Sequence, residues 1–93
     1  MNKDYVKKRS IVELLTSKAD NNDFITINYK YIANDVGCSY SYVRKVMKTL
    51  IKNGLVRYID KDSSGKNNIY DLEPLFKLLW ENYVNSENYE EDY

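Results

Sequence analysis

The fold is decided by the stretch IANDVGCSYSYVRKVMKTLIKNGLVRYID, residues 32–60. Two helical patterns lie on either side of a Gly-Cys-Ser turn, and a run rich in β-branched and aromatic residues follows the second. Gly37 stands where a helix ends and the chain must take a left-handed turn, which glycine does at the lowest cost. The stretch therefore predicts short helices over residues 29–36 and 40–53, joined by a tight turn.

The second of these helices has two contrasting sides. Asn28 and Ser39 are suited to cap the two helices, because their side-chain oxygens can accept a backbone N–H of the first turn. At 100° per residue the apolar side of the second helix comprises Val43, Val46, Met47 and Leu50. The opposite side comprises Ser41, Lys45, Lys48 and Lys52, flanked by Arg44, Tyr42 and Thr49. One side is thus expected in the core and the other in solvent or on a polyanion.

The remaining patterns place this pair of helices within a mixed fold. Apolar spacing predicts a first helix over about 5–19, and FITI (residues 24–27) reads as a short strand. LVRYID and NNIYDL alternate as two strands of a hairpin around the polar loop KDSSGK, and a last helix over 72–85 begins after Asp71. The expected class is α+β, mostly α, in the order helix, strand, helix, helix, hairpin, helix, as one domain over residues 1–85.

Charge is unevenly distributed along a chain whose formal net charge is zero. Residues 28–70 hold eight basic and three acidic side chains, whereas residues 71–93 hold one basic and seven acidic ones. A basic middle of net +5 is typical of a polyanion-binding module. The tail over residues 86–93 is acidic and is expected to be disordered.

Composition argues against several other classes of protein. There is no histidine, only one cysteine, no Gly-rich phosphate loop and no metal-ligand cluster, so we expect neither an enzyme nor a metal or other cofactor. The apolar runs are too short to cross a bilayer and no signal peptide is visible, so no membrane partner is expected. A single cysteine fits a reducing compartment, and the predicted location is the cytoplasm.

The quoted stretch, together with SGKNNIYDL, resembles the winged helix-turn-helix family of DNA-binding domains over residues 11–72. The family's turn matches Gly37, Cys38 and Ser39, and the end of its recognition helix matches Gly54, Leu55 and Val56. The resemblance implies a winged helix with an additional C-terminal helix, which binds double-stranded DNA. The wing is also similar to those of plasmid and phage replication and partition proteins.

The helix over 40–53 fits the major groove, and the wing over 56–72 would contact the backbone or the minor groove. The predicted base-reading residues are Ser41, Tyr42, Arg44 and Lys45. Those predicted to contact the DNA backbone are Tyr29, Lys30, Tyr40, Lys48 and Lys52. Those predicted for the wing are Lys61, Ser63, Ser64, Lys66 and Asn67. The competing interpretation is that these lysines only solvate an exposed surface.

The last helix carries more apolar surface than one small domain needs. It either closes the core or pairs with a second copy, and the predicted dimerisation residues are Phe76, Trp80, Tyr83 and Val84. A homodimer would present two recognition helices to two half-sites one helical turn apart. The acidic tail is either a solvated end or a docking segment for a basic protein partner.

These features favour a dimeric, sequence-specific transcriptional repressor. A plasmid or phage partition or replication protein is the first alternative, and a winged-helix protein-interaction module is the second. The target sequence, an effector and redox activity at Cys38 stay open, although a small buried hydrophobe is the simpler interpretation of Cys38. Residues 60–71 also match part of the EF-hand spacing, but strand-like flanks and Asp at the last position argue against calcium.

Overall fold

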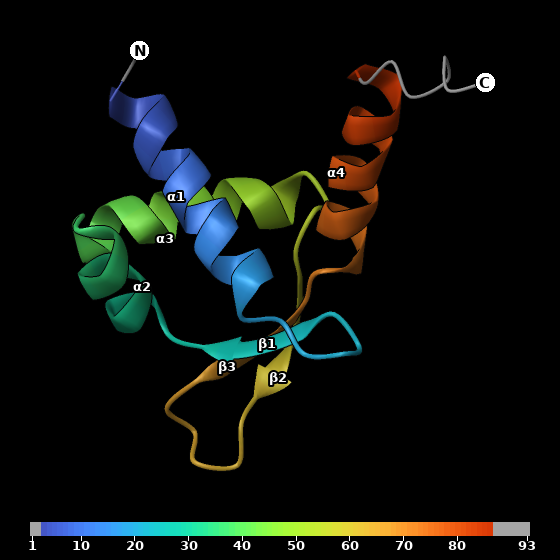
Figure 1. Cartoon of the computed structure of the whole chain (residues 1–93). Coiled ribbons are helices and arrows are strands. Elements are labelled where there is room, and N and C mark those ends of the chain that lie inside the picture. The colour runs from blue at the N-terminus through green and yellow to red at the C-terminus, as the bar shows by residue number, and fades with distance from the viewer. Residues whose placement is uncertain (1–2, 87–93) are drawn as a thin grey trace.

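The computed structural model describes residues 3–86, and its elements follow the predicted order (Figure 1). The helices are α1 (Lys3–Ser17), α2 (Tyr29–Val36), α3 (Tyr40–Lys52) and α4 (Glu73–Ser86), and the strands are β1 (Phe24–Ile27), β2 (Arg57–Lys61) and β3 (Asn68–Asp71). The α+β, mostly helical class is confirmed. The first helix begins and ends two residues earlier than the apolar spacing predicts, because residues 18–23 form the turn into β1.

Both predicted caps form, and they fix where α2 and α3 begin. The Asn28 side chain accepts a hydrogen bond from the backbone N–H of Tyr31, and the Ser39 side chain accepts one from Tyr42. Gly37 ends α2 with φ at 81°, and its N–H donates to the carbonyl of Ala33. A side chain at this φ would be strained, so glycine sets the tight turn that brings α3 against α2.

The three strands form one antiparallel sheet in the order β1-β3-β2. β3 is central, because Ile25 of β1 and Tyr58 of β2 both lie opposite Tyr70. The register between β2 and β3 shifts between Tyr58 and Asp60, which leaves Ile59 unpaired in a bulge. β1 thus attaches the wing hairpin to the helices, a pairing that the sequence patterns did not specify.

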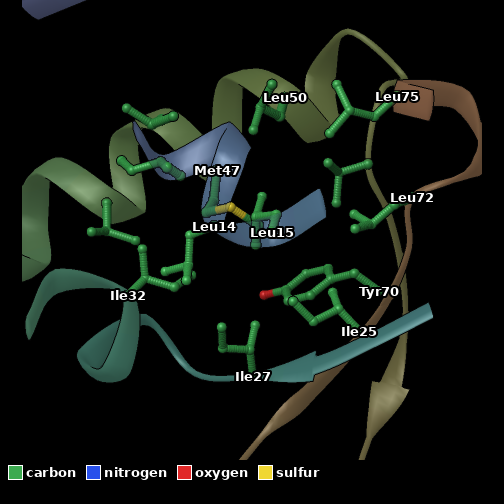
Figure 2. Packing of buried hydrophobic residues seen from close by; sticks show 14 of the residues in the cluster. Leu14, Leu15, Ile25, Ile27, Ile32, Met47, Leu50, Tyr70, Leu72 and Leu75 are labelled. Atoms are coloured by element: carbon green, nitrogen blue, oxygen red, sulfur yellow. The ribbon is translucent and has the colours of Figure 1, made fainter. Parts of the chain in front are cut away.

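The core lies between the sheet and helices α1, α2 and α3 (Figure 2). Tyr70 extends from β3 into its centre, with Leu15 on the helical side and Ile25 on the sheet side. The buried residues are Ile11, Leu14, Leu15, Ile25, Ile27, Ile32, Ala33, Val43, Val46, Met47, Leu50, Val56, Tyr70, Leu72 and Leu75. The predicted apolar side of α3 is therefore the side that packs.

α4 contributes little to this core. It begins where Leu72 and Leu75 are buried, but the apolar side chains further along the helix are exposed. Figure 1 shows α4 extending away from the sheet. The predicted tail starts one residue too early, because Ser86 is still helical, and residues 87–93 lie outside the described part. Within residues 3–86, no helix is both long and apolar enough to cross a membrane.

Two isoleucines allow a matched test of the packing. Ile32 is fully buried, whereas Ile59 is 48% exposed. We expect Ile32→Ala to lower the free energy of unfolding by about 2–5 kcal/mol, because it leaves a cavity. We expect Ile59→Ala to change it by about 0.5 kcal/mol or less, as surface substitutions usually do. Urea unfolding followed by circular dichroism measures both, and equal losses would contradict the assigned core.

Candidate nucleic-acid interface

The outward side of α3 is a continuous basic surface. Residues 40–52 contain four basic side chains and no acidic one, and the helix turns its apolar side into the core. Arg44, Lys45, Lys48 and Lys52 are exposed, as is Ser41 near the start of the helix. A helix that is anchored on one side and uncovered on the other can enter a DNA groove with its positive charges leading.

Tyr42 is placed differently from the other predicted base-reading residues. Its hydroxyl donates to the Asp4 carboxylate at 2.6 Å and contacts the Asp4 carbonyl oxygen at 3.1 Å. Burial, and then the hydrogen bond to Asp4, raises the pKa of Tyr42 to about 12. The side chain therefore lies on the flank of α3 that faces α1, where it holds the two helices together. Lys45 borders the same cleft but is exposed.

The wing loop is organised by one carboxylate. Asp62 accepts hydrogen bonds from the Ser64 hydroxyl at 2.7 Å and from the Asn67 side-chain amide at 2.9 Å. It also accepts one from the Asn67 backbone N–H at 3.3 Å. Ser64 and Asn67, predicted to contact DNA, are thus engaged inside the loop. The exposed positions that this leaves at the tip are Ser63 and Lys66.

A chain of side-chain hydrogen bonds joins this loop to the helix-turn-helix. The Asn28 amide nitrogen donates to the Asn67 side-chain oxygen at 2.7 Å, while its oxygen caps α2 at Tyr31. The Asn67 amide nitrogen donates in turn to Asp62. These hydrogen bonds thus connect the first turn of α2 to the Asp62 carboxylate in the wing. They fix the position of the wing relative to α2, and hence to α3.

A basic groove lies between the start of α2, the start of α3 and the wing. Its volume is about 340 Å³, and its lining includes Tyr29, Lys30, Tyr40, Lys61 and Lys66 together with two asparagines. The tyrosine rings are 5.9 Å apart between centroids and tilted by 57°. Three residues predicted to contact backbone and two predicted for the wing are therefore brought together on one side of the molecule.

The chain matches the model of the DnaD N-terminal domain over residues 8–91. It belongs to this family. The family's domain is a winged-helix-like domain of DNA replication proteins, and membership indicates a replication-related domain that binds DNA or self-associates. No curated protein and no solved structure matches the chain. Family membership favours the replication alternative over a transcriptional repressor, and it gives no support to a plasmid or viral origin.

In this DnaD-type domain, one basic residue of the wing is neutralised by neighbours that sequence reasoning missed. Arg57 forms ion pairs with Asp71 at 2.8 Å and Glu73 at 3.1 Å. The hydrogen bond to Asp71, above all, raises the pKa of Arg57. The arginine therefore ties β2 to the start of α4. Opposite charges on facing strand positions are the signal that could have indicated it, since Arg57 lies opposite Asp71 in the ladder.

The predicted dimerisation residues of the domain divide between two environments. Phe76 is partly buried against the core, and Val84 is half-buried. Trp80 and Tyr83 are 63% and 51% exposed, and their rings stack with centroids 5.5 Å apart. Leu78 and Leu79 are exposed beside them. We call Leu79, Trp80 and Tyr83, which share one side of the helix, the α4 patch.

The remaining candidate chemistry of the domain is limited. Cys38 is a half-buried free thiol packed against the core. Within residues 3–86, no group of three or more acidic, histidine or cysteine side chains could hold a metal ion. The partial EF-hand pattern instead forms the wing hairpin, in which the Asp62 carboxylate binds hydrogen-bond donors of its own loop.

The Asp62 hydrogen bonds make the order of the wing depend on pH. Hydrogen bonds from Ser64, and then from Asn67, lower the pKa of Asp62 from 3.8 to about 2. Because the folded pKa is the lower one, the contribution to stability is complete above about pH 4 and is lost as pH falls through about 2. We expect the Asn67 side-chain amide signal in NMR spectra to titrate with a midpoint near 2. A midpoint near 4 would contradict these hydrogen bonds.

Proposed function

We propose that this chain is the duplex-DNA-binding and self-associating module of a DNA replication protein. The observation that carries the proposal is the outward side of α3, with four basic residues and no acidic one on a helix anchored by its apolar side. Family membership supplies the replication context. The wing lysines extend the positive surface beyond α3.

In this proposal α3 lies in the major groove and its first turns approach the base edges. Arg44 is the strongest candidate for base readout, because a guanidinium can bond a guanine through two parallel hydrogen bonds. Such a contact is worth roughly 1–3 kcal/mol of discrimination. Ser41 and Lys45 flank it, while Lys48 and Lys52 neutralise phosphates further along the helix. Phosphate contacts position the protein without reading sequence.

The wing provides the second contact of the proposed complex. The hydrogen bond from Asn28 Nδ2 to Asn67 Oδ1, at 2.7 Å, holds the wing against the start of α2. The wing and α3 would therefore contact DNA as one surface. Lys61, Ser63 and Lys66 then face the backbone or minor groove next to the site read by α3. A pre-ordered wing keeps the entropic cost of binding low.

The salt dependence of duplex affinity tests this proposal. We expect Lys48→Ala with Lys52→Ala to weaken duplex binding and to lower the slope of log K against log salt by about 2, since each lost phosphate contact removes roughly 0.9. The matched control is Lys7→Ala with Lys77→Ala, which removes the same charge from exposed positions outside α3 and the wing. Fluorescence anisotropy at several salt concentrations provides the values.

The outcomes separate the functions that remain. An unchanged slope in the α3 variant, or an equal change in the control, would contradict the proposed α3 surface. No duplex binding by the wild type even at low salt would assign the basic surface to a protein partner. Tighter binding to duplex from the replication origin of the genome that encodes this chain than to random duplex would show that the domain binds DNA sequence-specifically.

Self-association rests on the α4 patch. At 100° per residue, Leu79, Trp80 and Tyr83 share one side of α4, and exposed large apolar side chains that lie together are of the kind that marks protein contacts. Trp and Tyr are also the residues that most often dominate binding energy at interfaces. A second copy would cover the patch symmetrically, so that each α4 contributes the same residues. Two α3 helices would then be available to one DNA molecule.

Trp80 allows a direct test of the dimer. We expect sedimentation equilibrium of the wild type to give twice the 11.0 kDa chain mass. Trp80→Ala should weaken self-association by about 30-fold or more, as the loss of a binding hot spot does. Tyr58→Ala is the control, because Tyr58 is 48% exposed but lies on the wing. A monomeric wild type, or equal effects of the two substitutions, would refute an interface on α4.

A further inference from the structure

We propose that the groove between the wing and the starts of α2 and α3 binds an unpaired stretch of DNA. The phosphates of the unpaired strand would lie on Lys30, Lys61 and Lys66, where they take the place of duplex backbone at the two wing lysines, and a base would stack on Tyr40. This activity goes beyond duplex recognition by α3 and does not require it. The groove's lining contains three lysines and two tyrosines but no carboxylate.

The groove combines the two features that single-strand sites share, which are positive charge along a path and aromatic rings beside it. Tyr29 packs partly against the core, but Tyr40 is 56% exposed and lies outside the core cluster. At 5.9 Å and 57° the Tyr29 ring supports the Tyr40 ring from one side. More than half of Tyr40 is therefore available to a ligand without rearrangement.

Neighbouring contacts hold these groups in place. The Lys61 ammonium donates to the Asn68 side-chain oxygen at 3.2 Å, and the Asn68 amide donates to the buried Tyr70 hydroxyl at 3.1 Å. An ammonium has three N–H donors, so Lys61 keeps two for a phosphate. Burial, and then a hydrogen bond with Tyr29, raises the pKa of Tyr70. Tyr29 and Lys61 are thus both connected to the central strand of the sheet.

The aromatic rings favour unpaired DNA over duplex. In a duplex the bases stack on one another and present phosphates and base edges, so a tyrosine at the groove rim gains nothing from its ring face. An unpaired base exposes its own face, and stacking on an aromatic side chain then contributes to affinity. A volume of about 340 Å³ lies at the small end of ligand sites, which run from roughly 300 to 1,000 Å³, and suits one nucleotide.

The position of the groove suggests which DNA would use it. Tyr40 opens α3, and Lys61 and Lys66 belong to the wing, so the groove lies between the two elements proposed to hold duplex. A strand that leaves a duplex beside α3 could enter the groove directly. A junction between double- and single-stranded DNA would therefore contact both surfaces of one domain.

The test compares an oligothymidylate of about 12 nucleotides, within the range of single-strand site sizes, with a duplex of equal length. We expect Tyr40→Ala to weaken oligothymidylate binding by about 5- to 100-fold, the effect of losing one base stack. Tyr40→Phe should stay close to the wild type because it keeps the ring. Tyr58→Ala, at an exposed tyrosine outside the groove, should have no effect. Duplex affinity should change little in Tyr40→Phe and Tyr58→Ala, and in Tyr40→Ala it should fall clearly less than oligothymidylate affinity, because a backbone contact of Tyr40 with duplex does not use its ring face.

The two DNA arms keep this inference distinct from the proposed function. Duplex binding without oligothymidylate binding at low salt would contradict single-strand binding in the groove and leave duplex binding by α3 unaffected. Oligothymidylate binding without duplex binding would contradict duplex binding by α3 and leave the groove proposal unaffected. Equal losses for both DNAs in Tyr40→Ala would reduce the groove to a duplex backbone contact. Polyglutamate that competes as well as oligothymidylate would make it a general polyanion site. Thermal melting of each variant confirms that its fold is retained.

Discussion

The geometry of the candidate interface depends on two hydrogen bonds made by the side chain of Asn28. Its oxygen caps α2, and its amide nitrogen holds Asn67 in the wing at 2.7 Å. Aspartate and serine cap helices about as well as asparagine does. Neither could make the second bond: a carboxylate would face the Asn67 oxygen without a proton, and a hydroxyl is too short to serve both partners. Position 28 therefore requires an amide side chain, because its oxygen accepts one hydrogen bond and its nitrogen donates the other.

The orientation of each side-chain amide in this series of hydrogen bonds is fixed by the group that it contacts. Once the Tyr31 N–H fixes the Asn28 oxygen, the Asn28 nitrogen must donate to Asn67, and the Asn67 nitrogen must donate to the Asp62 carboxylate. Hydrogen bonds aligned in one direction polarise and strengthen one another. The wing is thus joined to the helix-turn-helix by directional bonds. Its lysines and the start of α3 consequently form one surface around a groove.

The surface of α3 is basic because the helix has no acidic residue of its own, although Asp4 of α1 borders the cleft beside Lys45. Arg57 is neutralised by two ion pairs, one with Asp71 at the end of β3 and one with Glu73 at the start of α4. The basic residues of α3 have no acidic neighbour on their own helix. A formal net charge of zero therefore conceals a polarised molecule, and its field depends on which pairs form and not on the total.

Local patterns were sufficient to predict most of the fold. The caps at Asn28 and Ser39, the turn at Gly37 and the apolar side of α3 each depend on residues within about one turn, and all were confirmed. The pairing of β1 with β3 and the bond from Asn28 to Asn67, 39 residues apart, depend on the tertiary fold and leave no local signal. The contact of Tyr42 with α1 was not predicted for the same reason. Helical spacing places Tyr42 on a flank of α3 but does not show which element covers that flank.

The exposed side of α4 connects stability with the proposed association. A helix of fewer than about 15 residues is marginal in water without tertiary packing, and beyond Phe76 most of the apolar side chains of α4 are exposed. Figure 1 shows α4 and the start of α1 extending from the end of the molecule opposite the wing. A second copy bound there would stabilise α4 and leave the wing accessible. Association would then use α4 while the wing stays available to DNA, so that association and the wing contact do not exclude each other.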